Sequence, residues 1–535
     1  MLKFKHLFLA APLLCLSAAA LTGCSSDEDG DMILRILNSE DYIYEFDEKY
    51  DVEMQDQDNP DNLAFRMDMI DQFEQYWENL PENKGKDLQI VYDTFDTNET
   101  MFNELKTGKT TYDVCIPSDY MVQKLASLGM LHKLDNVDNR LWKNISGYLE
   151  NALKGILIPN ENGDLIEGST DSDYDYCVPY MWGTLGIMYN PNYFVEKCGF
   201  EDEEAVHDFF STWDSLYEKS SKGTFSIKDS VRDTYTVCLI HAFADKVQEC
   251  EDSAALKAII NKHDAETIAT VKEDMLSLKA NAFGFETDSG KTDMTTEKIG
   301  ANLCWSGDAT WAITEARGEG EEDELSLYYS LPVGDEENKS GSNIWFDCFC
   351  MPKNAKDENN QTPEEKAQYK LGEDFIEFMS RPENAVQNCY CVGYTPAVAG
   401  PDMLNYMHDC YDADDEAQDT VDYNLNYFFN PDYDPTDEST WYDEEYIIVA
   451  DSDIAMRELR AQYPMLEDLP RLAIMNDFGP KGNQALLDMW ESVRTNPLPV
   501  WAIVIFVVEG LTALGFVAYF VSKKVVRKKL KEERK

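Results

Sequence analysis

The sequence predicts an α/β protein with a parallel sheet and more than one domain. Short apolar runs alternate with helical patterns through the first part of the chain, as strands and helices do in β-α-β units. Hydrophobic residues make up 43% of the 535 residues and aromatic residues 12%, which indicates a folded chain. This length exceeds what one ordinary core holds, so we expect two or three domains.

The order of elements places two loops at the same edge of this sheet. We expect strands at 33–37, 88–92 and 112–117, and helices that begin at Thr97 and at Pro117. Residues 38–42 and 117–120 then follow the carboxyl ends of two parallel strands. Open α/β sheets bind ligands at such ends, so these two loops are candidates for a binding site.

Residues 341–348, Gly-Ser-Asn-Ile-Trp-Phe-Asp-Cys, predict a buried strand. Trp345 and Asp347 are two residues apart and therefore point to the same face. An indole beside a carboxylate suits an organic ammonium ion, through a cation–π contact and a charge-assisted hydrogen bond. The alternative is a core Trp345 next to an Asp347 that caps the following loop. Further along, we expect an extended segment at 178–190 and a helix at 364–379.

Both ends of the chain are expected to act in export and anchoring. Residues 1–24 combine a basic start with an apolar run, which predicts a secretory signal. The last four, Leu-Thr-Gly-Cys, resemble a bacterial lipobox and predict lipidation of Cys24. Residues 500–521 are almost wholly apolar and long enough to span a bilayer. The basic tail 522–535 is then expected in the cytoplasm. Glu509, inside the span, either faces a partner helix or is a tolerated charge.

Charge and cysteine usage narrow the class of partner. The chain has 46 Lys and Arg against 102 Asp and Glu, a net charge of −56 at pH 7. Such a charge excludes nucleic-acid binding and attracts cations, although acidity also serves solubility alone. Among 13 cysteines, the close pairs are spaced Cys-x-Cys rather than Cys-x-x-Cys. We therefore expect buried thiols, no metal site and no cofactor.

Several short blocks follow one another along the chain in a specific order. They lie at 98–101, 112–120, 128–135, 179–183, 345–347, 352–356, 375–385 and 393–396. In order and spacing they resemble the bacterial extracellular spermidine/putrescine-binding proteins of ABC transporters, a type 2 periplasmic-binding-protein family. The resemblance covers about residues 31–495, with insertions around 155–175 and 403–460. It implies a two-lobed α/β fold, to which this chain would add a C-terminal transmembrane helix.

The resemblance also implies lobe boundaries and a set of site residues. Lobe 1 would comprise 25–177 and 348–398, and lobe 2 would comprise 178–347 and 399–495, with hinge closure between them. The matching ligand positions are Tyr42, Ser118, Tyr120, Trp305, Trp345, Asp347 and Tyr394, with carboxylates at Asp41 and Asp233. Three positions depart from the family pattern: Ser39 for a Trp, Ser230 for a carboxylate that adjacent Asp229 would replace, and Met475 for a Gln.

These residue types fit the chemistry of a polyamine. A polymethylene chain with spaced ammonium groups requires aromatic walls and carboxylates at the nitrogens. The sequence thus predicts a non-enzymatic, membrane-anchored extracellular protein that captures putrescine or spermidine for an ABC permease. Three alternatives remain: a glycosidase-like cleft, a same-fold receptor for another cation, amino acid or iron complex, and a membrane-tethered sensor subunit. No nucleophile elbow, zinc motif or P-loop supports the enzyme.

Overall fold

The computed structural model describes residues 32–46, 67–134, 140–317, 325–353, 362–414 and 417–495. The predicted signal with Cys24, the predicted span at 500–521 and the basic tail lie outside these residues. Within them, no helix combines the length and the apolar character that crossing a bilayer requires.

The strands form one large mixed sheet and a separate two-stranded ribbon. The large sheet runs in the order β2-β1-β3-β9-β4-β7-β5-β6, with β10 and β8 paired to β4 and β13 paired to β9. Its strands are β1 Met32–Ser39, β2 Leu88–Phe95, β3 Val114–Cys115, β4 Cys177–Tyr189, β5 Phe225–Lys228, β6 Gly284–Glu286, β7 Ala301–Trp305, β8 Tyr328–Ser330, β9 Ser342–Cys350, β10 Thr395–Pro396 and β13 Leu472–Ala473. The ribbon pairs β11 Thr420–Asn424 with β12 Ile447–Asp451 in antiparallel fashion.

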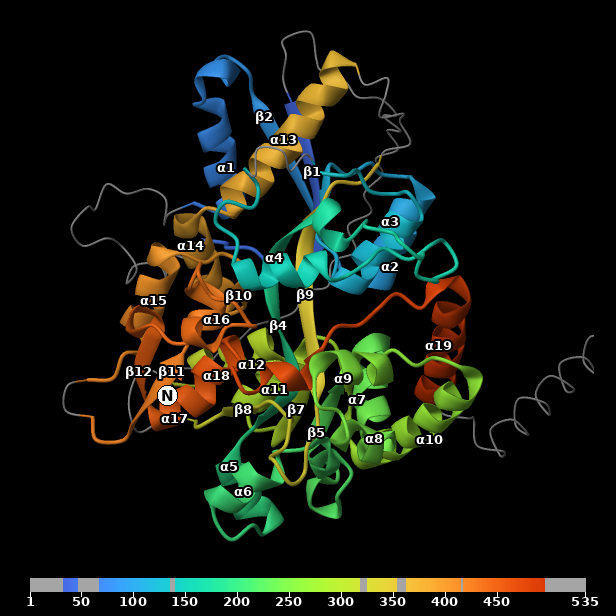
Figure 1. The fold of residues 1–535 in the computed structure, drawn as a ribbon, viewed down its shortest axis with the longest axis vertical. Helices are drawn as coiled ribbons and strands as arrows, with labels where there is room; N and C mark the ends of the chain where they lie inside the picture. Colours follow the sequence, from blue (N-terminus) through green and yellow to red (C-terminus); the bar gives the residue numbers. More distant parts are fainter. Residues whose placement is uncertain are drawn as a thin grey trace, which may run out of the picture.

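The parallel sheet predicted from the sequence is present at the two ends of this sheet, whereas at its centre β9 has only the short β13 as a parallel partner. The pairs β1–β2, β1–β3, β5–β6 and β5–β7 are parallel. In the middle, β4 and β9 are antiparallel over most of their length. Both are buried on both faces, as strands at the centre of a covered sheet must be. They run between the upper and lower halves of the molecule (Figure 1).

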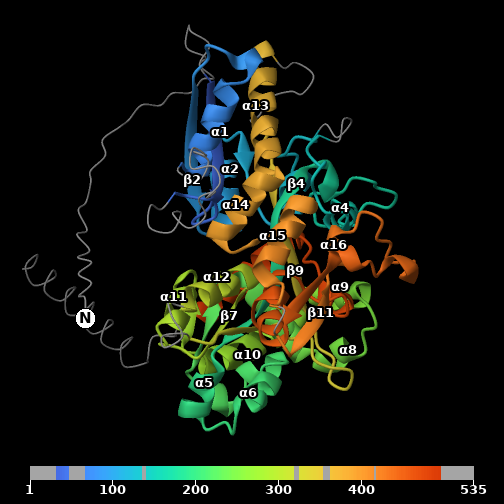
Figure 2. The ribbon, with the colours of Figure 1, turned by 90° about the vertical axis from the view of Figure 1, so that its left-hand side faces the viewer.

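Helices cover both ends of the sheet, so the molecule has two lobes (Figure 1, Figure 2). The upper half of the view in Figure 1 contains α1 Met69–Glu78, α2 Asn98–Thr107, α3 Asp119–Ser127, α4 Gly147–Lys154, α13 Pro363–Met379 and α14 Pro382–Val392. Around β5 and β7 lie α5 Pro191–Tyr193, α6 Glu203–Phe209, α7 Val231–Ala242, α8 Ala244–Gln248, α9 Ser253–Ile260, α10 Ala265–Asn281, α11 Ser289–Thr295, α12 Ser306–Ala316 and α19 Gly479–Arg494. A third group beside β4 contains α15 Pro401–Tyr411, α16 Asn426–Phe429, α17 Ser452–Ile454 and α18 Arg460–Gln462.

The buried side chains form two hydrophobic clusters. One lies in the lower lobe and includes Phe225, Tyr235 and Val271, from β5, α7 and α10. The other is larger and continues from the upper lobe along β4 into the third group of helices, where Trp182 stacks on Phe428. Burial of this apolar surface, rather than hydrogen bonding, provides most of the free energy that holds each lobe together.

Most predicted elements are confirmed, with two differences. The third strand is limited to β3, because the chain turns at Pro117, whose carbonyl accepts a hydrogen bond from the amide of Cys348. The sequence predicts no helix or strand in the insertion around 403–460, yet its described residues contain most of α15 and the β11–β12 ribbon. Their stability comes from packing against the rest of the chain, which local pattern does not record.

Gly183 on β4 lies directly opposite Trp345 on β9 and leaves room for the indole. A Cβ atom at this position would lie 2.7 Å from the Trp345 ring and would also clash with the Ser306 hydroxyl. We expect Gly183→Ala to lower the free energy of unfolding by about 1–3 kcal/mol, the usual cost of overpacking. Urea denaturation measures this change. Gly147→Ala, at an exposed position with open space around it, is the control, and equal stability of the two variants would contradict the prediction.

Candidate functional site

A cavity of about 280 Å³ lies where the carboxyl ends of strands from both lobes meet. The upper lobe contributes the ends of β1 and β2 and the starts of α2 and α3, and the lower lobe contributes β5, α7, β7, α12 and α19. The ten residues predicted to bind ligand all line it: Asp41, Tyr42, Ser118, Tyr120, Asp229, Asp233, Trp305, Trp345, Asp347 and Tyr394. The three departures, Ser39, Ser230 and Met475, line it as well.

Asp347 on β9 is the best-defined polar group of the cavity. The Tyr42 hydroxyl donates to its Oδ2 at 2.8 Å, and the Ser118 hydroxyl donates to its Oδ1 at 2.6 Å. No basic side chain of the described residues forms an ion pair with it. Burial raises the pKa of Asp347 to about 6, although the two hydroxyl donors lower it. A carboxylate held in this way would bind an entering cation strongly.

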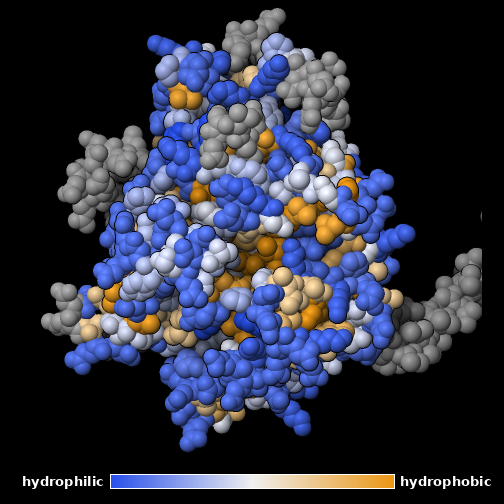
Figure 3. Space-filling model, viewed as in Figure 1, coloured by the Kyte–Doolittle hydropathy of each residue, from blue (hydrophilic) through white to orange (hydrophobic). Residues whose placement is uncertain are grey.

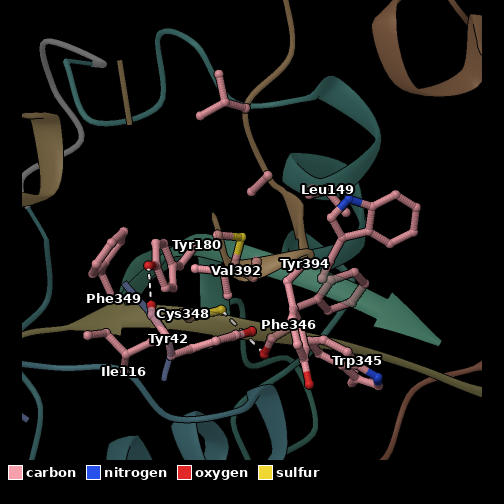
Figure 4. Close-up of a cluster of buried hydrophobic side chains, with 14 of the residues drawn as sticks. Tyr42, Ile116, Leu149, Tyr180, Trp345, Phe346, Cys348, Phe349, Val392 and Tyr394 are labelled. Atoms are coloured by element: carbon pink, nitrogen blue, oxygen red, sulfur yellow. Dashed lines mark hydrogen bonds between the residues drawn. The ribbon is translucent and has the colours of Figure 1, made fainter. Parts of the chain in front are cut away.

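Local structure fixes both donors to Asp347. Ser118 is the N-cap residue of α3, but its hydroxyl does not cap the helix and bonds Asp347 instead. The Asn98 side chain holds Ser118 from the other side, donating to its hydroxyl and accepting from its amide, both at 3.0 Å. The hydroxyl of Tyr180 donates to the carbonyl oxygen of Tyr42 at 2.6 Å (Figure 4). The donors are therefore positioned before any ligand arrives.

Aromatic rings surround this carboxylate. The Tyr42 ring meets the Tyr394 ring edge to face at 4.9 Å and the Tyr180 ring at 5.4 Å. Trp345 lies 5.9 Å from Tyr394 and, like Asp347, reaches the cavity from β9, as the two-residue spacing predicts. Figure 4 shows Tyr42, Trp345 and Tyr394 grouped at this strand. Tyr180 does not line the cavity, so its role is packing at the strand crossing.

A second carboxylate, Asp233, is buried and enters from the lower lobe. It lies in the first turn of α7, and its Oδ2 accepts a hydrogen bond from the Trp305 indole at 3.1 Å. Ser230 caps the same helix by accepting from the Asp233 amide. Burial raises the pKa of Asp233, while Ser230 and Trp305 oppose the shift. The cavity thus has a partly buried carboxylate on the central strand and a buried one on the lower lobe, each beside an indole.

The remaining predicted residues lie toward the rim or have partners within the chain. Asp41 is exposed and adopts a left-handed backbone with φ of 51°, a strained conformation that often marks functional loops. Asp229 pairs with Arg494 of α19 at 2.8 Å. The Tyr120 hydroxyl donates to Glu99 at 3.3 Å, and the Arg232 guanidinium lies 4.9 Å from the Tyr120 ring centre.

The sequence reasoning missed the charged groups Lys228, Asp308 and Lys291 on the wall formed by the lower lobe. Lys228 ends β5, and its Nζ lies 2.6 Å from Oδ2 of Asp308 at the start of α12. The Tyr394 hydroxyl donates to the other oxygen of Asp308 at 2.8 Å. Neighbouring predicted residues provided a signal, since Lys228 directly precedes Asp229 and Asp308 follows Trp305 by three positions.

Negative charge predominates around the cavity. Its carboxylates are Glu40, Asp41, Asp96, Glu99, Asp229, Asp233, Asp288, Asp308 and Asp347, and its basic side chains are Lys228, Lys291 and Arg494. Figure 3 shows hydrophobic side chains gathered in a hollow midway between the lobes, within a largely hydrophilic surface. In the described part of the chain, no group of three or more acidic, His or Cys side chains is arranged to hold a metal ion. The site suits a slender organic cation.

The raised pKa of Asp347 predicts a pH-dependent effect of Asp347→Asn on stability. Because this pKa lies near 6 rather than the usual 3.8, the carboxyl favours folding when protonated, and this contribution is lost as pH rises through about 6. Asn resembles the protonated form. We expect ligand-free Asp347→Asn to be more stable than the native chain at pH 7.5, by up to about 3 kcal/mol. Urea denaturation at pH 4.5 should show that the difference in free energy of unfolding between the variant and the native chain is less than half of its value at pH 7.5. A difference that does not change with pH would contradict the prediction.

Comparison with known proteins assigns the family. The spermidine/putrescine-binding periplasmic protein of Escherichia coli strain K12 is 24% identical over 324 residues, which cover 60% of this chain and 74% of that protein. The putrescine-binding periplasmic protein SpuD of Pseudomonas aeruginosa strain UCBPP-PA14 is 25% identical over 305 residues, covering 56% and 69%. These relatives confirm the resemblance predicted from the sequence blocks.

Structural comparison agrees on the fold. A structure from Listeria monocytogenes, described as a spermidine/putrescine ABC transporter, matches with a TM-score of 0.53 at 20% identity, covering 86% of this chain and 99% of its own. The two-lobed α/β fold is thereby confirmed. The family model for bacterial extracellular solute-binding proteins matches residues 68–402, more than half of the chain. The chain therefore belongs to the bacterial extracellular solute-binding proteins.

Proposed function

We propose that this chain is the polyamine-binding component of an ABC importer and captures putrescine or spermidine between its lobes. The observation that carries the proposal is Asp347, a partly buried carboxylate with two hydroxyl donors, no basic partner among the described residues, and aromatic rings around it. An ammonium group would supply the missing positive charge, and the rings would cover its methylene chain.

The electrostatics support an organic cation over other solutes. A sugar needs several neutral donors and acceptors, whereas carboxylates are the most numerous polar side chains of this cavity wall. An amino acid adds a carboxylate that requires a free cationic group, but the three basic side chains of the wall all lie within 4 Å of a carboxylate: Arg494 beside Asp229, and Lys228 and Lys291 beside Asp308. The enzyme alternative gains no support from the relatives, which are solute-binding proteins.

Binding and closure would be coupled through the central strands. Tyr42 and Ser118 reach the cavity from the upper lobe, Asp233 and Trp305 from the lower lobe, and Asp347 from β9 between them. A ligand that contacts all of these groups stabilises the closed arrangement of the lobes, in a hinge motion about β4 and β9. We keep the lobe boundaries predicted from the sequence as part of this proposal.

The same proposal includes the membrane. A lipid on Cys24 and the apolar segment 500–521 would hold the two lobes at the outer surface of the membrane, beside a permease that receives the ligand. The basic residues of 522–535 would then lie in the cytoplasm. Glu509 inside that segment would face the permease or be a tolerated charge.

Removal of the Asp347 charge tests the proposal directly. We expect Asp347→Asn to bind polyamine at least tenfold more weakly in titration calorimetry, because an ammonium ion would lose its counter-charge. Asp409→Asn, at an exposed carboxylate on α15, is the control and should bind as the native chain does. Unchanged affinity in folded Asp347→Asn would contradict the assignment. Binding of lysine or arginine without binding of putrescine would favour the amino-acid alternative.

Ligand binding should also release protons near pH 6. With a pKa of about 6, Asp347 is half protonated at that pH, and an ammonium beside it favours the ionised form. We expect release of up to about half a proton per ligand at pH 6 and almost none at pH 8. Calorimetry in two buffers of different ionisation enthalpy measures this number, and absence of release between pH 5 and 7 would contradict it.

A further inference from the structure

The lower wall of the cavity contains an ammonium group that belongs to the protein. Lys228 has a side chain only 2% exposed. Its Nζ lies 2.6 Å from the Asp308 carboxylate, 2.6 Å from the Thr287 carbonyl oxygen and 3.4 Å from Glu286. An ammonium has three donors, so this group is fully satisfied. The Nζ also lies 4.3 Å from the centre of the Trp305 ring, in cation–π contact.

This arrangement repeats the chemistry that surrounds Asp347. Each carboxylate accepts a hydrogen bond from a tyrosine hydroxyl at 2.8 Å, Asp347 from Tyr42 and Asp308 from Tyr394. The rings of these two tyrosines are in contact, so the two carboxylates share one aromatic wall. Each also has an indole nearby. The difference is that Asp308 holds a lysine ammonium, whereas Asp347 has no basic partner among the described residues.

The ion pairs of the cavity show which of its carboxylates remain available to a cationic ligand. Asp308 and Glu286 are balanced by Lys228 and by Lys291, whose Nζ lies 3.9 Å from Asp308. Asp229 is balanced by Arg494. Among the described carboxylates that line the cavity without an ion pair, Asp233 is buried, and Asp347 and Glu99 are partly buried. Of these, Asp233 and Asp347 are the two that lie beside an indole, and together they match a ligand with two ammonium ions.

We propose that Lys228 permanently occupies an ammonium position of the cavity, beside Asp308 and Trp305, and thereby makes the site selective for diamines over triamines. This inference rests on the proposed polyamine function and specifies its substrate class. A third ligand ammonium would have to compete with a tethered, fully hydrogen-bonded group. Burial opposes the charge on Lys228, but Asp308 and Glu286 outweigh it and raise the pKa of Lys228, so the group stays charged.

The native chain provides the first test, by titration calorimetry with three amines. Putrescine has two ammonium ions, spermidine has three, and N-butylputrescine is spermidine with one terminal ammonium replaced by methyl. We expect putrescine to bind at least tenfold more tightly than spermidine, and spermidine no more tightly than N-butylputrescine. Spermidine binding tenfold more tightly than both other amines would overturn the inference. Binding of none of the three would instead refute the proposed function.

Variants of two lysines provide the second test. We expect Lys228→Met to raise the ratio of spermidine affinity to putrescine affinity at least tenfold, because Asp308 and Trp305 become available to the third ammonium. Lys339→Met removes the same charge at an exposed position outside the cavity lining, and should leave the ratio unchanged. In Lys228→Met/Asp308→Asn the gain should disappear. A folded Lys228→Met variant with the native ratio of affinities would overturn the inference. If that variant does not fold, the calorimetry of the native chain with the three amines tests the inference alone.

Discussion

The site is organised around the hydrogen bonds that Tyr42 and Ser118 donate to the partly buried carboxylate of Asp347. Its two hydrogen-bond donors come from separate loops, Tyr42 after β1 and Ser118 before α3, and both loops are held by further hydrogen bonds. Removing the unpaired Asp347 carboxylate from water costs free energy, and the raised pKa of Asp347 reflects this cost. A cationic ligand removes it. The same group therefore destabilises the empty site and stabilises the occupied one.

The fold explains why Asp347 lies next to residues from both lobes. The antiparallel pair β4–β9 crosses the molecule, with parallel sheet on either side, so a residue in the middle of β9 lies between two strand-end loop clusters. Gly183 on β4 leaves space for Trp345, which places the indole beside the cavity. The pairing of β4 with β9, the space that Gly183 leaves for Trp345 and the charge of Asp347 therefore all affect the same part of the cavity. A change in any of them would alter ligand binding.

The sequence predicted the strongly patterned elements and the carboxylate–indole pair on β9, because strand alternation alone places Trp345 and Asp347 on one face. It did not predict the antiparallel centre of the sheet, since β4 and β9 lie far apart in the chain. It also missed the contact between Lys228 and Asp308. That contact depends on how α12 packs beside β5, and a lysine next to Asp229 looks locally like part of a solvated loop.

A crystal structure of the native chain with putrescine would show directly whether Asp347 binds the ligand. We expect one ligand nitrogen about 3 Å from the Asp347 carboxylate, the methylene chain against Trp345 and Tyr394, and Lys228 still bonded to Asp308. A structure in which no ligand nitrogen approaches Asp347, or in which the ligand has displaced Lys228 from Asp308, would contradict this expectation.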